Sequence, residues 1–239
     1  MAAGGNMSWA RRERADCILD VVKDLLLRWG YRRVTIEEIA KRAGIGKGTI
    51  YLHWPTRERL FSAVAAREAA AMTDMVVVGM RTDVAEIMPH RVMRRIFLEA
   101  IRRPVLRAIY TRDAEIMGAL ATDPAGKSLE SAKLIASREY LEVLSAHGLL
   151  RSGLQPQILD YMLTATVFGF FAAEPLMSDE LGLGLDDKAD YLADTLRHAF
   201  ETSRPPTKKR LSAAADKVIA IYEELARDYR ISVYGVPNE

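Results

Sequence analysis

Apolar residues recur at spacings of three and four along almost the whole chain, the pattern of amphipathic α-helices. Two examples are the set Ile18, Val21, Val22, Leu25, Leu26 and Trp29 and the set Tyr191, Leu192, Thr195, Leu196, Ala199 and Phe200. No segment shows the sustained alternation of apolar and polar residues that favours β-strands. Glycine and proline residues divide the pattern into about ten helical segments. The sequence therefore predicts an all-α protein.

The composition indicates a folded protein with a sizeable core. The chain has 239 residues, of which 49% are apolar and 28% charged, so most of it is too apolar to be disordered. Its single cysteine, Cys17, excludes a disulfide framework and is expected to pack within a helix rather than act as a nucleophile. No apolar run approaches the roughly 20 residues that span a bilayer, and the first residues lack the apolar core of a signal peptide. We expect a soluble, cytoplasmic protein without a membrane partner.

Charge is distributed unevenly, although the net charge is only +2. Residues 1–60 carry 12 Lys and Arg against 7 Asp and Glu, a net charge of +5, whereas the rest of the chain carries −3. Positive charge gathered at one end predicts that this end meets a polyanion.

Residues 35–54, TIEEIAKRAGIGKGTIYLHW, predict two short helices joined by a tight turn. Thr35 and Glu38 have the spacing of a capping box, which satisfies free amides at a helix start. Gly44 falls where the first helix must end, because glycine adopts a left-handed conformation without strain. Ala40 allows a second helix to cross closely, and Ile50 is placed to pack back against it. This spacing is typical of a helix-turn-helix, whose second helix enters the DNA major groove.

The polar residues of this segment fit DNA binding. Side chains on the second helix would reach phosphates and base edges, and Gly48 would let the backbone approach. Two further residues cap or open helices whose positive ends receive phosphates. The predicted DNA-binding residues are Thr35, Lys47, Gly48, Thr49, Tyr51, His53 and Arg57.

Two alternative interpretations apply to these residues. Each polar side chain could simply be solvated, and Tyr51 could pack its ring and present only its hydroxyl. The glycine-rich GIGKGT lacks the spacing of GxxxxGK[ST] and follows a helix instead of a strand, which disfavours a phosphate-binding loop of that kind.

Residues 30–61, GYRRVTIEEIAKRAGIGKGTIYLHWPTRERLF, resemble the N-terminal domain of TetR-family transcriptional regulators. Two departures are Gly46, where many relatives have a serine that supplies an N-cap hydroxyl, and Trp54, where phenylalanine is common. The resemblance implies the same DNA contacts, a helical C-terminal domain with an inducer pocket, and a dimer formed through the last two main helices. We expect a DNA-binding domain at 1–60, with 1–8 disordered, and a regulatory and dimerisation domain at 61–239.

The dimer is expected to be a four-helix bundle across a two-fold axis. Helices at 156–174 and 187–203 would form it, with a loop at 177–187 between them. Small residues in TATVFGFFAA would permit close approach, and the apolar stripe from Tyr191 to Phe200 would supply the contact area. A last helix is expected at 211–230, followed by a loose tail from Ser232.

The residues that would line the inducer pocket implied by the resemblance are predicted from helix phase. Aromatic and methionine side chains with a few hydroxyls are typical of an apolar ligand site, and the candidates are Phe97, Tyr110, Met117, Tyr140, Tyr161 and Phe168. Ordinary core filling is the alternative for these residues and for the set of methionines. Glu99 lies one turn from arginines and is expected to form a solvated ion-pair cluster rather than to anchor a ligand.

No cofactor or metal site is predicted, because the four histidines have no partner at metal-ligand spacing. The features together predict a ligand-responsive repressor that binds a pseudo-palindromic double-stranded DNA operator as a homodimer. The resemblance further implies that a small, largely apolar inducer would release it by a population shift, with the helix that starts at Arg57 as the lever. Two alternatives stay open. One is a DNA-binding regulator without a small ligand, controlled by a partner or acting as an activator, and the other is an enzyme fused to a DNA-binding head.

Overall fold

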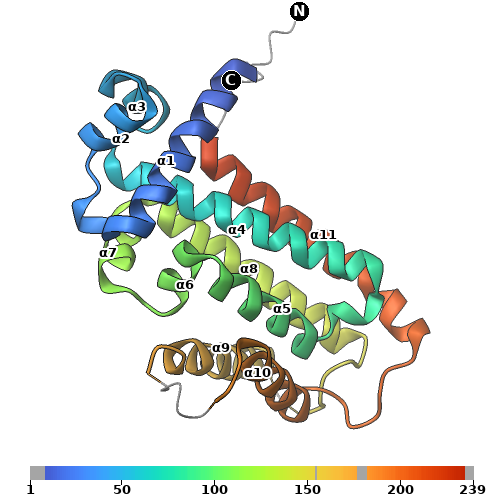
Figure 1. Ribbon diagram of the computed structural model, residues 1–239. Helices are drawn as coiled ribbons and strands as arrows, with labels where there is room; N and C mark the ends of the chain where they lie inside the picture. The colour runs from blue at the N-terminus through green and yellow to red at the C-terminus, as the bar shows by residue number, and fades with distance from the viewer. Residues whose placement is uncertain (1–8, 154, 177–181, 235–239) are drawn as a thin grey trace, which may run out of the picture.

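The computed structural model describes residues 9–153, 155–176 and 182–234, and most of them are helical (Figure 1). The helices are α1 (Trp9–Arg33), α2 (Ile36–Ala43), α3 (Lys47–His53), α4 (Arg57–Thr82), the 3-10 helix η1 (Val84–Ile87), α5 (Pro89–Arg102), α6 (Pro104–Tyr110), α7 (Ala114–Thr122), α8 (Pro124–Ala146), α9 (Pro156–Ala173), α10 (Leu185–Phe200) and α11 (Lys208–Tyr234). Within the described residues, β-structure is limited to one isolated bridge between Leu150 and Glu201. The prediction of an all-α protein is confirmed.

At one end of the molecule, α1, α2, α3 and the first turn of α4 form what we call the head, residues 9–60; residues 61–234 are the body (Figure 1). The head has an apolar core of its own, which continues into α4. Two residues distant in sequence, Val105 and Val233, belong to the same core. The head is therefore packed against the body at several points along the chain.

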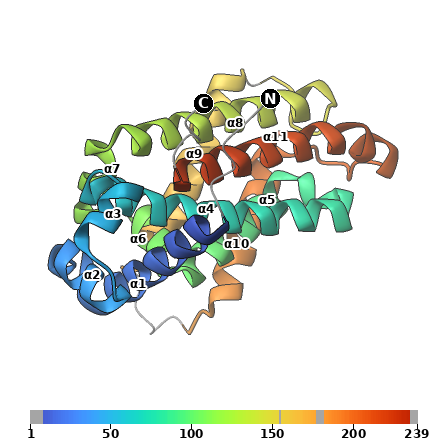
Figure 2. The same cartoon turned by 90° about the horizontal axis from the view of Figure 1, so that it is seen from above.

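Two long helices connect the head to the body. α4 runs from the head into the body, and α11 returns beside it in the opposite direction (Figures 1 and 2). Ion pairs between Arg81 and Glu223 and between Asp74 and Arg230 join the two helices along their length. The end of α11 thereby reaches the head.

The core of the body lies among α4, α5, α8, α9, α10 and α11. Leu192, Leu196 and Phe200 of α10 are buried in it. The prediction that the stripe of α10 supplies the dimer contact is therefore wrong for these three residues. An apolar helix face can be buried against its own chain as well as against a partner, and the sequence pattern is the same in both cases. Tyr191, from the same stripe, stays exposed.

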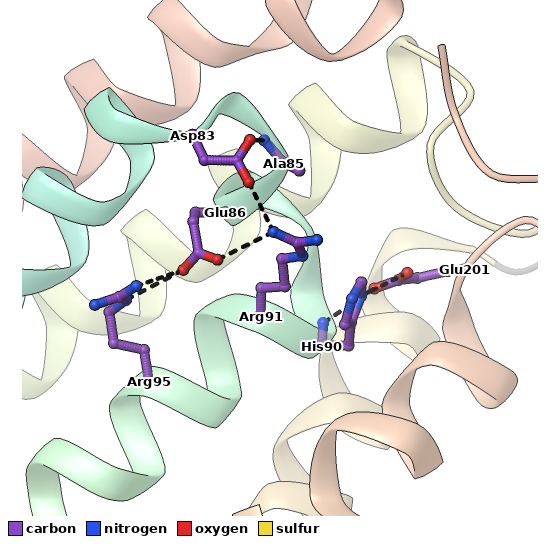
Figure 3. A network of polar contacts seen from close by, with 7 residues as sticks. All are labelled: Asp83, Ala85, Glu86, His90, Arg91, Arg95 and Glu201. Atoms are coloured by element: carbon purple, nitrogen blue, oxygen red, sulfur yellow. Dashed lines mark hydrogen bonds and ion pairs between the residues drawn. The ribbon is translucent and has the colours of Figure 1, made fainter. Parts of the chain in front are cut away.

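A polar network holds the turn between α4 and α5 (Figure 3). Asp83 accepts a hydrogen bond from the backbone amide of Ala85 at 2.9 Å, and this bond is the main reason that the pKa of Asp83 is lowered. Arg91 Nη1 lies 2.8 Å from Asp83 Oδ2 and 3.2 Å from Glu86 Oε1. Glu86 also pairs with Arg95 at 2.7 Å. These contacts fix where α5 begins.

Beside this network, the buried carboxylate of Glu201 meets His90 (Figure 3). It accepts a hydrogen bond from the backbone amide of His90 at 3.0 Å, and its two oxygens lie 2.7 and 2.8 Å from His90 Nδ1. Because His90 lies in the first turn of α5, the carboxylate satisfies an amide that has no partner within the helix. The pair ties the start of α5 to the end of α10.

The C-terminal tail differs from the prediction. α11 continues to Tyr234, so residues 232–234 are helical, and Val233 is buried. The prediction of a loose tail is wrong for these residues, because Val233 packs in the head, a contact with residues that are distant in sequence. The predicted loose residues 235–239, the predicted disordered residues 1–8 and part of the predicted loop, 177–181, lie outside the described residues.

Candidate nucleic-acid interface

α2 and α3 form the predicted helix-turn-helix. Thr35 Oγ1 accepts a hydrogen bond from the backbone amide of Glu38 at 3.2 Å and caps α2. Gly44 ends α2 in the left-handed conformation, with φ 66° and ψ 31°. Ala40 and Ile50 are both buried. The Thr35 half of the predicted capping box, the left-handed turn and the buried anchor are confirmed.

The second helix, α3, leaves its predicted DNA face open to solvent. Lys47, Gly48 and Tyr51 are exposed, and Thr49 is half-buried. Gly46 precedes α3 and provides no side-chain hydrogen bond to its first amides, as expected from the missing hydroxyl. Contact of these residues with DNA stays a prediction.

Lys47 does not extend freely into solvent. Its Nζ lies 2.5 Å from Oε1 of Glu37, which belongs to the first turn of α2. The hydrogen bond from Lys47 holds the pKa of Glu37 below its ordinary value. Both side chains are mostly exposed, so the pair can be exchanged for a phosphate at little cost.

Arg57 lies half-buried behind this surface. Its Nε donates to the carbonyl of Val34 at 3.0 Å, and its Nη2 donates to the carbonyl of Tyr31 at 2.5 Å. The guanidinium carbon is 4.1 Å from the centroid of the Tyr31 ring. Gly30, with φ 71°, interrupts α1 just before this point. Arg57 therefore holds the connection between α1 and α2, and its contact with DNA stays a prediction.

His53, at the end of α3, packs its ring 5.2 Å from that of Trp54. Burial lowers the pKa of His53, and the neighbouring charges of Arg11 and Arg14 lower it further. The imidazole therefore favours its neutral form near pH 7.

Three residues of this surface were missed by the sequence reasoning. Leu52 is 75% exposed on α3. Arg11 Nη2 donates to the carbonyl of Leu52 at 3.2 Å, and Arg14 is close enough to act on His53. The basic run RRER at 11–14 was the available signal for the two arginines. Leu52 could have been found because it is an apolar residue that follows Tyr51 on a helix whose outer face is otherwise polar.

The structure brings only some of the predicted ligand-binding residues together. Phe97 of α5 and Tyr110 of α6 both pack on Phe171 of α9, with ring centroids 4.9 and 4.5 Å away. Tyr140 of α8 is buried, and its hydroxyl donates to the carbonyl of Ile87 at 2.8 Å. Burial raises the pKa of Tyr140 well above its ordinary value.

The remaining candidates lie elsewhere. Met117 is half-buried on α7, and on α9 Tyr161 and Phe168 are 74% and 42% exposed. Phe168 has Arg112 at 5.5 Å from its ring centroid. The sequence reasoning missed Phe171, which is fully buried between Phe97 and Tyr110.

An open cleft of about 480 Å³ lies at the junction of head and body. Tyr31, Arg32, Arg57 and Glu58 line it together with Ala114, Gly118 and Thr122 of α7. None of the six predicted ligand-binding residues belongs to it.

The described residues contain no group of three His, Cys, Asp or Glu side chains that could hold a metal ion. Glu99 pairs with Arg103 one turn away, as predicted, but both side chains are largely buried, so the prediction that the pair is solvated is wrong. None of the helices in the described ranges is both long and apolar enough to cross a membrane.

The head is similar to a known family of regulators. Residues 18–64 match the family described as "Bacterial regulatory proteins, tetR family". The nucleoid occlusion factor SlmA of Glaesserella parasuis serovar 5 is 27% identical over 104 residues, which cover 43% of this chain and 52% of the relative. The HTH-type transcriptional regulator AlkX of Mycobacterium tuberculosis is 28% identical over 114 residues, covering 46% and 54%. The chain thus spans about half the length of these curated relatives.

Among solved structures, a putative transcriptional regulator from Saccharomonospora viridis in complex with choline has a TM-score of 0.60 at 20% identity. The match covers 80% of this chain and 99% of that one. At this identity the likeness shows a shared fold, and it extends through the body.

The capped helix pair, its exposed second helix and the helical body define a helix-turn-helix protein of the regulator type. Residues 18–64 match the TetR family of transcriptional regulators, so the head carries a helix-turn-helix domain of the kind found in that family.

Proposed function

We propose that this protein is a ligand-responsive repressor that binds a pseudo-palindromic DNA operator as a homodimer. Residues 1–60 would be the DNA-binding domain, and 61–239 the regulatory and dimerisation domain. The protein would act on the nucleoid in the cytoplasm, by binding alone and without catalysing a reaction.

The observation that carries the proposal is the exposed face of α3. Ile50 is fully buried and anchors the helix, while Lys47, Gly48 and Tyr51 face solvent. A helix presented in this way fits the major groove, with lysine toward phosphate and the tyrosine toward phosphate or base edges. Leu52 is added to the proposed contacts, because an exposed apolar side chain at this place can meet a thymine methyl group.

The dimer is proposed to form through one face of α9, with support from α10. Ile158, Tyr161, Ala165, Phe168 and Gly169 recur along α9 at helical spacing, and all are exposed. A stripe of large apolar and small residues on the surface of a helix is typical of a protein interface. Two copies related by a two-fold axis would place their recognition helices about 34 Å apart, one turn of DNA.

The ligand is proposed to enter near Phe97, Tyr110 and Phe171, the part of the predicted pocket that the structure brings together. These three rings come from α5, α6 and α9, so a molecule among them would bias how these helices pack. The choline complex of the S. viridis protein supports a small-molecule site in a body of this fold. Choline and toluene are suitable first probes, because aromatic rings bind quaternary ammonium groups and apolar rings alike.

The proposal is tested by selecting duplexes from a random DNA library with the full-length protein and measuring affinity by fluorescence anisotropy. We expect a two-fold symmetric site bound by one dimer, with Tyr51→Ala weakening binding about tenfold or more. The control is Ile135→Ala, which removes an exposed apolar side chain from α8, away from the head and outside the proposed dimer face.

Enrichment of no sequence, or equal binding by wild type and Tyr51→Ala, would contradict the DNA assignment. For the ligand, release of the duplex by a probe should be lost on Phe171→Ala while DNA binding remains. Release that persists unchanged in that variant would place the ligand elsewhere.

A further inference from the structure

We propose that the last turn of α11 is a latch that positions the recognition helix for operator binding. The latch consists of residues 232–234. The inference rests on the proposed DNA-binding function and adds a regulatory element to it.

The latch binds the residue that ends the recognition helix. Trp54 is the C-cap of α3 and is buried, and its indole Nε1 donates to the backbone carbonyl of Val233 at 2.9 Å. The side chain of Val233 is 1% exposed and belongs to the apolar core of the head. The recognition helix therefore ends at Trp54, a side chain that is held by the last turn of α11.

The neighbouring residues of the latch contact two other helices of the head. The hydroxyl of Tyr234 donates to Asp16 Oδ1 of α1 at 2.6 Å, and the guanidinium carbon of Arg12 lies 4.9 Å from its ring centroid. Arg59, in the first turn of α4, bonds the backbone carbonyl of Ser232. Together with Trp54, the latch joins α1, the end of α3 and the start of α4.

The other end of α11 belongs to the body. Leu211, Ala214, Val218 and Tyr222 are buried in the body core. A helix of 27 residues is roughly 40 Å long, and ion pairs hold it to α4 along this length. A displacement of the body helices would therefore reach Trp54 through α11, which packs along α4, as well as through α4 itself.

The recognition helix depends on such support. α3 has only 7 residues and no side-chain hydrogen bond at its N-cap. Its buried anchors are Ile50 and Trp54, whereas its contacts with Glu37 and Arg11 lie at the surface. Because two recognition helices must fit one operator together, loosening the second anchor lowers affinity without removing any DNA contact.

The test compares latch variants of the full-length protein. Val233→Ala removes the apolar contact, and Tyr234→Ala removes the contacts with Arg12 and Asp16. Tyr234→Phe keeps the ring, and Ile231→Ala alters a side chain on the same turn that is 42% exposed. Operator affinity is measured over a range of salt concentrations, together with hydrogen exchange of the α3 amides and unfolding in urea.

We expect Val233→Ala and Tyr234→Ala to weaken operator binding by roughly three- to thirtyfold under conditions in which each variant is fully folded. The slope of affinity against salt should stay that of wild type, because no phosphate contact is lost. Exchange of the α3 amides should be faster, while amides of α5 and α8 keep their rates. Tyr234→Phe should recover most of the affinity, and Ile231→Ala should match wild type.

Wild-type affinity and wild-type α3 exchange in both alanine variants would overturn the latch. Uniformly faster exchange in all helices would also overturn it, since it would show a general loss of stability. If Val233→Ala does not fold, the pair Tyr234→Ala and Tyr234→Phe decides the question. Hydrogen exchange is measured without DNA. If the wild-type protein bound no duplex, that result would contradict the proposed function. The exchange rates of the α3 amides in the variants would then decide whether the latch positions the recognition helix.

Discussion

Lys47 Nζ and Glu37 Oε1 lie 2.5 Å apart and join the start of the recognition helix to the first turn of α2. The cation proposed to meet a phosphate is therefore already paired in the free protein. The pair is mostly exposed, so it contributes little to stability. Its main effect is that the carboxylate of Glu37 competes with a DNA phosphate for Lys47.

Glu37→Gln is accordingly expected to tighten operator binding about two- to fivefold, because it removes the competing carboxylate and a negative charge near the DNA. Lys47→Ala should weaken binding and reduce the salt slope by about one. Both are measured by titrating a selected duplex at several salt concentrations. Glu224→Gln is the matched control, since it removes the same charge from an exposed position on α11. Equal effects of Glu37→Gln and Glu224→Gln would show that net charge alone is responsible.

The His90–Glu201 pair yields a prediction about stability. Glu201→Ala should lower the free energy of unfolding by about 1–3 kcal/mol, because the amide of His90 and its ring lose a buried acceptor. Glu201→Gln keeps an acceptor and should lose less. The measurement is unfolding in urea, with Glu139→Ala on the exposed face of α8 as control. A Glu201→Ala variant as stable as the control would mean that the pair contributes nothing to the fold.

Ser62 of α4 is fully buried, and its Oγ has no hydrogen-bonding partner among the described residues. Ser62→Ala should raise the free energy of unfolding by about 1 kcal/mol, since it removes an unsatisfied polar group and favours the helix. Ser128→Ala on α8, where the serine is exposed, isolates the helix-propensity share of this gain. A smaller gain at Ser62 than at Ser128 would contradict the burial argument.

Three buried tyrosines predict a loss of stability in alkali. Burial raises the pKa values of Tyr140, Tyr222 and Tyr229, whereas in the unfolded chain tyrosine ionises near pH 10. The folded protein therefore keeps protons that the unfolded chain releases. The stability contributed by these groups is complete below roughly pH 10 and falls as the pH rises above it.

This prediction is checked by urea unfolding at increasing pH, with ultraviolet absorbance to follow tyrosine ionisation. Tyr229→Phe should make the decline less steep, whereas Tyr191→Phe, at an exposed position, should leave it unchanged. A free energy of unfolding that stays constant through the alkaline range would contradict the burial of these hydroxyls.

The features of the head that could be predicted depend on neighbours in sequence. The cap at Thr35 and the left-handed turn at Gly44 each involve residues within about one helical turn, so the local sequence specifies them. The predicted DNA face of α3 follows in the same way from the position of Ile50. The pairing of Lys47 with Glu37 and the role of Arg57 behind α1 were not predictable, because they depend on how α1, α2 and α4 are placed relative to one another.

In the body, periodicity predicted the helices but not their partners. The same apolar stripe on α10 fits a dimer contact or the core of its own chain, and the structure places Leu192, Leu196 and Phe200 in the core. Of the predicted ligand residues, Phe97 and Tyr110 come together on Phe171, while Tyr161 is exposed. The periodicity of a helix predicts on which side of that helix a residue lies, but it does not predict which other helix packs against that side.

The sequence by itself determined an all-α chain with a helix-turn-helix near its start, because helix periodicity, caps and turn glycines act over a few residues. Only the tertiary structure decided that the end of the chain reaches back to the beginning. Trp54 and Val233 are 179 residues apart, and no local pattern marks one as the partner of the other. Their contact arises from the packing of two long helices against each other, and this packing places the recognition helix.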